Sequence, residues 1–335
     1  MKTLKLGTRK SALAQAQANW TAAQLRKAFP ELHVEIVLIT TTGDVVSSSP
    51  NASVGDPSLS LTPMMGSPPV TAGNDGQKGG LKALFTKEIE EALLDGRIDL
   101  AVHSLKDMSA QLPKGLTIGA VPEREDPRDA WISRTNTPFG KIPAAARIGT
   151  GAVRRQAQLK HLRPDIELIP IRGNVETRLK KLSLNDEIVA LDGIILALAG
   201  LKRLGHAQVA TEILPIDVLL PAVGQGCLGI QIRDRDPAVL PLMKALDHAP
   251  SRAAATAERA FLNTLGGNCQ TPIAGHASIE SGELTLRGLV ISPDGLQRVS
   301  AKENGRPFDA EGIGVRLAQK LLEAGADKIL KSSET

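Results

Sequence analysis

The sequence predicts an α/β fold with a smaller α+β unit towards its C-terminal end, and three observations lead to this prediction. Short apolar runs alternate with helical patterns along most of the chain, which is typical of helices packed on largely parallel sheets. From about Ser251 the order changes to one long helix followed by strands of alternating polarity. The length of 335 residues exceeds that of one small domain, so two or three domains are expected.

The expected strands and helices follow one another in this order. Buried strands are expected at the short apolar runs 34–39, 100–102, 166–169 and 194–198, and a strand of alternating polarity at 284–291. A helix is expected at 11–29, where apolar residues recur at helical spacing at Leu13, Ala16, Trp20 and Ala23. Further helices are expected at 85–94, from about 251 to the pair Gly266-Gly267, and at about 311–324.

Residues 46–75 break the alternation. This segment holds seven Ser, five Pro and three Gly, and no Lys, Arg or aromatic residue. A stretch that cannot bury apolar side chains is expected to form a mobile loop, and loops of this length are usually lids, binding loops or disordered insertions.

Composition argues against several classes of protein. The chain has only two Trp, five Phe and no Tyr, so aromatic platforms for single-stranded nucleic acid are not expected. Its first residues lack the apolar core of a secretory signal, and its longest apolar stretch, 193–201, is too short to span a bilayer. Two cysteines cannot form a disulfide framework. We therefore expect a cytoplasmic protein with no membrane or nucleic-acid partner.

Positive charge is concentrated in one stretch of the chain. The whole chain carries a net charge of +4, whereas residues 147–181 carry nine basic and three acidic residues. Arg154 and Arg155 follow a glycine turn there, and Arg172 and Arg178 flank a second one, next to expected helix N-termini. Guanidinium groups and helix N-termini both bind anions, which predicts one anionic ligand site. The alternative is a solvated helix face; no P-loop or GxGxxG motif supports a nucleotide.

The segment His103-Ser-Leu-Lys-Asp107 directly follows the strand expected at 100–102. Ligands of open α/β sheets bind beyond the carboxyl ends of the strands, so chemistry is expected at this turn. Lys106 and Asp107 supply a cation and a carboxylate suited to proton transfer. The alternative for so short a motif is a turn with an N-cap Asp, and His103 is expected to be a structural, hydrogen-bonded residue.

The two cysteines are expected to differ in role. Cys269 lies in the glycine-rich loop 266–272, where a thiol is accessible to a ligand and nearby cations would favour the nucleophilic thiolate. Cys227 lies in an apolar stretch and is expected to be a small core residue. No His is adjacent to Cys269, and no Cys/His spacing typical of a metal site is present.

Eight segments of the chain are informative as a set because of their order. They are Thr8-Arg-Lys-Ser-Ala-Leu-Ala14, Thr41-Thr-Gly-Asp44, Leu81-Lys-Ala-Leu-Phe-Thr-Lys-Glu88, His103-Ser-Leu-Lys-Asp107, Arg154-Arg-Gln156, Arg172-Gly-Asn-Val-Glu-Thr-Arg178, Ala199-Gly-Leu-Lys-Arg-Leu-Gly205 and Cys269-Gln-Thr-Pro-Ile273. In this order the chain resembles the porphobilinogen deaminase (hydroxymethylbilane synthase) family over nearly its whole length.

The resemblance implies the domains and the reaction. Domain 1 would comprise 1–122 and 227–246, with the loop insertion 46–75; domain 2 would comprise 127–220; domain 3, 249–335, would carry the cysteine loop. The first two are similar to the paired lobes of type II periplasmic binding proteins, and a monomer is expected. The family joins four porphobilinogen molecules head to tail, with loss of ammonia, into hydroxymethylbilane. The product grows on a dipyrromethane cofactor, which needs no metal and would be bound to Cys269 through a thioether.

The resemblance also implies the site residues. Asp107 is the catalytic carboxylate, which would bind pyrrole N–H groups, stabilise an azafulvenium-like cation and move protons. The cofactor-binding residues besides Cys269 are Ser104, Lys106, Thr150, Arg154, Arg155 and, at the cleft entrance, Lys82. Residues for the incoming and growing pyrrole carboxylates are Arg9, Ser11, Arg172, Arg178 and Arg203.

Three features depart from the family pattern. Gly151 and Ala152 stand where two Ser are usual, and the lost hydroxyl is expected to weaken cofactor assembly by about 1 kcal/mol. The cysteine loop reads Gly-Asn-Cys instead of Gly-Gly-Cys, and the loop at 46–75 is longer than expected.

Two other functions compete with this enzyme. A binding module with the same two lobes would sense a small anion without catalysis and would need neither Asp107 nor Cys269. A basic nucleic-acid binder would be retained on DNA in a salt-dependent way. The acidic remainder of the chain and the scarcity of aromatic residues argue against the second alternative.

Overall fold

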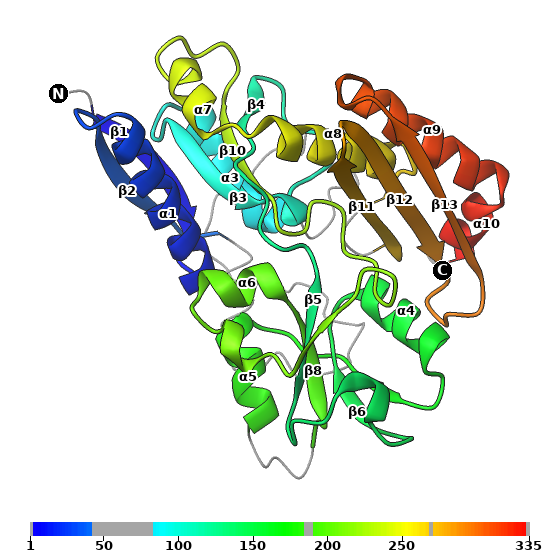
Figure 1. The fold of residues 1–335 in the computed structure, drawn as a ribbon. Coiled ribbons are helices and arrows are strands. Elements are labelled where there is room, and N and C mark those ends of the chain that lie inside the picture. Colours follow the sequence, from blue (N-terminus) through cyan, green and yellow to red (C-terminus); the bar gives the residue numbers. More distant parts are fainter. Residues whose placement is uncertain (1–2, 42–82, 184–189, 268–270, 333–335) are drawn as a thin grey trace, which may run out of the picture.

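The computed structural model describes residues 3–41, 83–183, 190–267 and 271–332. The loop expected at 46–75 lies outside them. In the described part of the chain, strands form two sheets of five strands and one of three (Figure 1). The predicted α/β class, with two similarly built lobes and a smaller C-terminal unit, is confirmed.

The first lobe contains the sheet with the order β2-β1-β3-β10-β4. Strand β1 (Thr3–Arg9) pairs in parallel with β2 (His33–Ile39) and β3 (Leu100–Ser104). Strand β10 (Leu228–Arg233) runs antiparallel between β3 and β4 (Leu116–Ala120). The helices that contact this sheet are α1 (Ala12–Ala28), α3 (Ala83–Leu94) and α7 (Leu240–Leu246).

The second lobe repeats this plan in the order β7-β6-β8-β5-β9. Strand β6 (Arg147–Gly149) pairs in parallel with β7 (Glu167–Ile169) and β8 (Gly193–Ala197), and β5 (Asp129–Ser133) runs antiparallel between β8 and β9 (Glu212–Leu214). Its helices are α4 (Val153–Leu162), α5 (Val175–Ser183) and α6 (Leu198–Arg203). Trp131 is fully buried in this lobe, and its ring meets Phe139 edge-on at 5.6 Å between centroids.

The C-terminal unit is an antiparallel sheet of β11 (Ile273–Glu280), β12 (Glu283–Ile291) and β13 (Arg298–Gly305). Helices α8 (Ala249–Thr264), α9 (Ala310–Glu323) and α10 (Ala326–Ser332) pack on it. Phe261 of α8 is fully buried against β12 at Gly288, where a Cβ atom would approach the Phe261 ring to 2.6 Å. A larger residue at this position would therefore push α8 away from the sheet.

Two segments, called crossovers here, carry the chain from one lobe to the other, and each is followed by the antiparallel strand of the lobe that it enters. Strand β5 follows the first crossover, residues 121–128, and β10 follows the second, residues 215–227. The predicted domain boundaries remain a prediction, although each sheet takes its strands from one of the three predicted domains.

One carboxylate of the C-terminal unit joins both crossovers. Glu258 of α8 is fully buried and accepts hydrogen bonds from the guanidinium of Arg124 at 2.6 Å and 3.3 Å. It also accepts from the backbone N–H groups of Gly224 and, at 2.7 Å, of Ala277 on β11. Arg124 lies in the first crossover and Gly224 in the second, so Glu258 connects the two crossovers to the third sheet.

The structure corrects the expected apolar face of α1. Trp20 is 41% exposed and Ala23 is exposed, whereas the buried residues are Gln17, Ala18, Thr21, Ala22 and Leu25. Polar residues can occupy the buried face because they are hydrogen-bonded: Thr21 Oγ1 donates to the carbonyl of Gln17, and Gln17 Nε2 donates to Ser104 Oγ.

A smaller difference concerns the strand expected at 194–198. Its last residue, Leu198, begins helix α6 instead.

The remaining short helices are 3₁₀ turns: η1 (Leu105–Asp107), η2 (Phe139–Lys141), η3 (Ala207–Val209) and η4 (Pro307–Asp309). Among the described residues, no helix combines the length and apolar character that crossing a membrane requires.

Candidate active site

The His103-Ser-Leu-Lys-Asp107 segment leaves the carboxyl end of β3 and turns at once into η1. The turn is fixed by a hydrogen bond from Leu105 N to the carbonyl of Cys227 at 3.0 Å. Burial lowers the pKa of the Lys106 ammonium to about 8, with Asp107 opposing this shift. Asp107 is exposed and makes no hydrogen bond or ion pair within the described ranges. A free carboxylate thus lies beside a half-buried ammonium group at the sheet edge where chemistry is expected.

His103 is buried, as expected of a structural residue, but its Nε2 atom has no hydrogen-bond partner among the described residues. Burial lowers its pKa to about 4, so the imidazole is neutral at physiological pH. The expectation of a hydrogen-bonded structural residue is met by the side-chain hydrogen bond between His103 and Gln231, and not by Nε2. Cys227 is buried as expected, and burial raises the pKa of its thiol to about 11.

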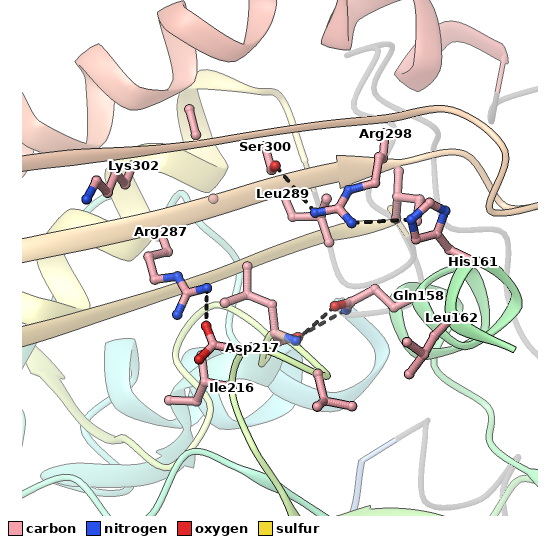
Figure 2. A pocket seen from close by; sticks show the side chains of 15 residues that line it. Gln158, His161, Leu162, Ile216, Asp217, Arg287, Leu289, Arg298, Ser300 and Lys302 are labelled. Carbon is pink, nitrogen blue, oxygen red and sulfur yellow. Dashed lines mark hydrogen bonds and ion pairs between the residues drawn. The ribbon is translucent and has the colours of Figure 1, made fainter. Parts of the chain in front are cut away.

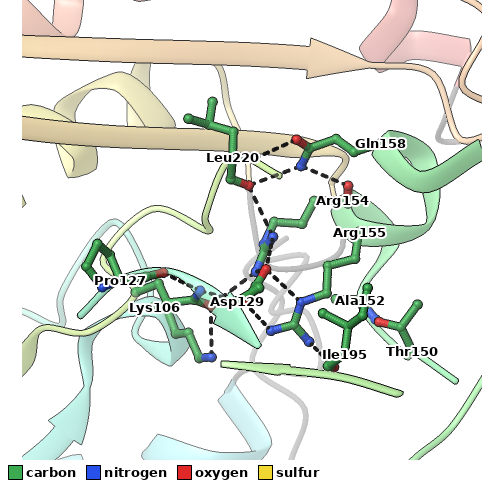
Figure 3. Close-up of polar contacts among 11 residues, drawn as sticks. Lys106, Pro127, Asp129, Thr150, Ala152, Arg154, Arg155, Gln158, Ile195 and Leu220 are labelled. Atoms are coloured by element: carbon green, nitrogen blue, oxygen red, sulfur yellow. Dashed lines mark hydrogen bonds and ion pairs between the residues drawn. The ribbon is translucent and has the colours of Figure 1, made fainter. Parts of the chain in front are cut away.

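The two neighbouring arginines of α4 point into the second lobe and meet one buried carboxylate (Figure 3). Both terminal guanidinium nitrogens of Arg154, Nη1 and Nη2, lie 3.1 Å from Asp129 Oδ2. Arg155 donates from Nε to the same oxygen at 3.0 Å and from Nη2 to Oδ1 at 2.8 Å. All three side chains are at least nine-tenths buried. The arginines therefore have an internal counter-charge in this structure.

Asp129 is a residue that sequence reasoning missed. It starts β5, directly before the buried stretch Ala130-Trp131-Ile132, and an acid at the start of a buried strand was the only available signal. Burial raises the pKa of its carboxyl, but the adjacent Arg155 and Arg154 guanidinium groups outweigh burial and hold this pKa far below its usual range. Asp129 is thus ionised at physiological pH.

Gln225 is a second missed residue, and it links Asp129 to Lys106. Its amide nitrogen donates to Asp129 Oδ1 at 2.7 Å, and its amide oxygen accepts from Arg154 at 3.1 Å and from Lys106 Nζ at 3.3 Å. Nothing in the sequence marks Gln225 as functional. It lies in the second crossover, so one fully buried amide connects the arginines of the second lobe to the lysine of the first.

A cavity of about 90 Å³ lies between the two lobes, where η1, α5, α6 and the second crossover meet. Its basic lining residues are Lys106, Arg155, Arg178 and Arg203, and no described residue that lines it is acidic. Burial, and then the nearby Arg155, lower the pKa of Arg178 to about 10. Burial also lowers the pKa of Arg203. These cations are desolvated, and an anion bound in the cavity would stabilise them.

The cavity brings together some of the predicted site residues and leaves others outside. Ser104 lines it, and so does Leu13 of α1. Arg9 and Ser11 are half-buried where β1 meets α1, and Arg172 is exposed before α5. Thr150 and Arg154 are buried behind the cavity wall. Cys269 and Lys82 lie outside the described residues.

The structure gives a reason for one departure from the family pattern. A Cβ atom at Gly151 would lie 2.5 Å from the backbone oxygen of Ile171, so a serine does not fit there without a backbone shift. Ala152 is the N-cap residue of α4 and makes no side-chain cap. Of the two positions where serine is usual, position 152 is the one that can accept a hydroxyl.

The donor set suits dipyrromethane, which carries acetate and propionate side chains. Guanidinium and ammonium groups bind carboxylates, and four of them surround one cavity. Among the described residues, no group of His, Cys, Asp and Glu has an arrangement suited to a metal ion.

Comparison with known proteins agrees with this chemistry. The family model described as porphobilinogen deaminase, dipyromethane cofactor binding domain, matches residues 4–64 and 71–241, and the model of the family's C-terminal domain matches residues 253–323. The chain is 46% identical over 327 residues to a porphobilinogen deaminase of Geobacter sulfurreducens, covering 98% of this chain and 93% of that protein. It is 45% identical over 330 residues to that of Syntrophomonas wolfei, covering 98% of each. The chain therefore belongs to the porphobilinogen deaminase family.

Proposed function

We propose that this chain polymerises four porphobilinogen molecules head to tail, with loss of ammonia, into hydroxymethylbilane on a dipyrromethane attached to Cys269. One observation supports the proposal beyond family membership: four cations line a single cavity between the lobes, and burial lowers the pKa of three of them, Lys106, Arg178 and Arg203. None of the described residues that line this cavity is acidic. Every pyrrole added brings two carboxylates into this space, so the cations suit both the cofactor and the product that grows on it.

The cofactor would be held by residues from both lobes. Bound dipyrromethane would supply a pyrrole ring carbon as the point of attachment for the first substrate. Its carboxylates would be bound by Lys106, Arg154 and Arg155, with Ser104, Thr150 and Lys82 beside them. Because Asp129 already pairs with Arg154 and Arg155, we propose that it positions their guanidinium groups while their remaining N–H groups meet the cofactor.

Asp107 would be the catalytic residue. Ammonia leaves the aminomethyl group of porphobilinogen and gives an azafulvenium-like cation on the substrate. The Asp107 carboxylate would accept the hydrogen bond of the pyrrole N–H and stabilise this positive charge. A carbon–carbon bond then forms between the substrate methylene and the ring carbon of the chain end, and Asp107 would take the proton that this ring carbon loses. Its exposure beside the cavity leaves it free for these contacts.

The remaining basic residues would bind the substrate and the growing chain. Arg178 and Arg203 line the cavity from the second lobe, while Arg9 and Ser11 are half-buried in the first lobe and Arg172 lies exposed before α5. The cavity of about 90 Å³ is smaller than an ordinary ligand pocket of about 300–1,000 Å³. We therefore propose that the lobes move apart as the product lengthens.

The substitution Asp107→Asn tests the catalytic assignment. It should lower turnover by about 10²- to 10⁴-fold, since a positioned acid–base group contributes this much, and should leave the cofactor adduct in the intact mass. The control is Asp95→Asn, which removes an exposed carboxylate of the same lobe that only pairs with Arg97. Unchanged turnover of the Asp107 variant would remove this residue from the mechanism.

Intact mass tests the cofactor attachment and the alternative of a non-catalytic binding module. The purified chain should carry a dipyrromethane-sized adduct that Cys269→Ala abolishes and Cys227→Ala preserves. A chain without an adduct after incubation with porphobilinogen would refute the transferase. We further propose a cytoplasmic monomer that needs no membrane or nucleic-acid partner.

A further inference from the structure

A second and larger cavity lies away from the cleft, between α4 of the second lobe and the open face of the third sheet (Figure 2). Its volume is about 350 Å³, which is within the range of about 300–1,000 Å³ for small-molecule sites. One wall is formed by α4 and residues 216–220, and the other by β12 and β13. The proposed polymerisation uses no residue of this cavity.

The cavity is basic. Arg287, Arg298 and Lys302 line it, and Asp217 is the one acidic residue among its described lining residues. Asp217 forms an ion pair with Arg287 at 2.5 Å. Neither Arg298 nor Lys302 forms an ion pair with any residue in the described ranges. Two cations therefore lack a counter-charge where strand and helix enclose space for a ligand.

Neutral partners orient the Arg298 guanidinium. It donates to His161 Nε2 at 3.3 Å, and its other terminal nitrogen lies 3.5 Å from Ser300 Oγ (Figure 2). His161 Nδ1 lies 2.9 Å from the carbonyl of Gly295, which can only accept, so Nδ1 carries the proton and Nε2 accepts from Arg298. The imidazole is then neutral, and the charge of Arg298 remains available to an anion.

The spacing of the two unpaired cations indicates the shape of the ligand. Arg298 and Lys302 lie on the same face of β13, four residues apart, so their Cα atoms are about 13 Å apart. A compact anion such as phosphate presents its charge at a single point. A molecule with two carboxylates separated by several bonds can meet both, as well as Arg287, which pairs with Lys302 across the strands.

We propose that this cavity binds a small di- or tricarboxylate anion between the second lobe and the C-terminal unit. The ligand would lie behind the arginines of α4, because Gln158 lines the cavity and donates hydrogen bonds to the carbonyls of Arg154 and Leu220 at 3.1 Å each. Leu220 O also accepts from the Arg154 guanidinium at 3.2 Å.

Calorimetric titration of the holoenzyme with citrate at low ionic strength tests the proposal. Citrate should bind at least about tenfold more tightly than inorganic phosphate, because its separate carboxylates can pair with both cations at once. The double variant Arg298→Gln/Lys302→Gln should weaken citrate binding at least about tenfold. Arg306→Gln removes one exposed charge just beyond β13, outside the cavity, and should leave citrate affinity unchanged.

A cleft variant separates this site from the cations between the lobes, which also attract carboxylates. Arg178→Gln should preserve the citrate affinity that the double variant loses. The proposal is overturned if citrate does not bind, if phosphate binds as tightly, or if Arg178→Gln abolishes binding while the double variant retains it. A circular dichroism spectrum matching the parent shows that the double variant is folded; if it is not, the single variant Lys302→Gln should weaken binding by itself.

Discussion

Replacing Asp129 by Asn tests how strongly the buried carboxylate supports the second lobe. The substitution keeps the size of the side chain but removes the one negative charge that Arg154 and Arg155 contact within the described part of the chain, at 2.8–3.1 Å. Removing one partner of a buried ion pair costs about 3–5 kcal/mol, because the other charge stays buried and uncompensated. Two cations lose their partner here, so we expect a loss of about 4 kcal/mol in the free energy of unfolding.

Tryptophan fluorescence in urea measures this loss in the relevant lobe. Trp131 is fully buried on β5, two residues after Asp129, whereas Trp20 is 41% exposed on α1 of the other lobe. Replacing Trp20 by Phe leaves Trp131 as the reporter. With a urea dependence of about 2 kcal/mol per molar, a loss of about 4 kcal/mol lowers the unfolding midpoint by about 2 M.

The control for this experiment is Asp234→Asn. The Asp234 side chain is 54% exposed, and its partner Arg235 is 93% exposed at 3.7 Å, so the expected change is below about 0.5 kcal/mol. An Asp129→Asn midpoint within about 0.3 M of the parent would refute the reasoning, because it would mean that the arginines do not depend on this carboxylate.

The parent protein and the Asp129→Asn variant should also differ in how their stability responds to acid. The pKa of Asp129 is held far below its unfolded value by Arg155 and Arg154, against the opposing effect of burial. A depressed pKa contributes stability above the unfolded pKa of about 3.9, and this contribution is lost as the pH falls below it. The parent midpoint should therefore fall more steeply than that of Asp129→Asn as the pH decreases below about 5.

Three further predictions concern packing, capping and thiol reactivity. Gly193→Ala places a Cβ atom 2.0 Å from the Trp131 ring and should lower the free energy of unfolding by more than about 1 kcal/mol. The control Gly140→Ala, which has open space around the new Cβ atom, should cause no such loss. Equal melting temperatures of the two variants would contradict this prediction. Ala152→Ser should cap α4 and stabilise the protein by about 1 kcal/mol in thermal melts, and a lower melting temperature would contradict the cap. Because burial raises the pKa of the Cys227 thiol to about 11, disulfide-exchange reagents at pH 8 should detect no thiol in the native holoenzyme and one after denaturation. Two thiols after denaturation would exclude a thioether on the other cysteine.

The sequence predicted the elements of the fold better than the contacts of the site. Apolar runs and helical spacing located β2, β3, α8 and α9 to within a few residues. This works because the residues that a strand or helix buries must be apolar and recur at the period of that element. The buried face of α1 was misplaced because Gln17 and Thr21 are buried through hydrogen bonds that no apolar pattern shows. Asp129 could not be assigned either: it meets Arg154 and Arg155 only when β5 and α4 pack together, a contact between distant parts of the chain.

The carboxylate of Glu258 joins the C-terminal unit to both segments that connect the lobes. Its hydrogen bonds to Arg124 and Gly224 hold both connecting segments at one point, so we expect the proposed opening of the lobes to leave this point in place. The helix that carries Glu258 ends at Thr264, shortly before the segment that contains Cys269. The proposed anchor of the growing product, Cys269, therefore follows closely in sequence on the helix that holds the two connecting segments together.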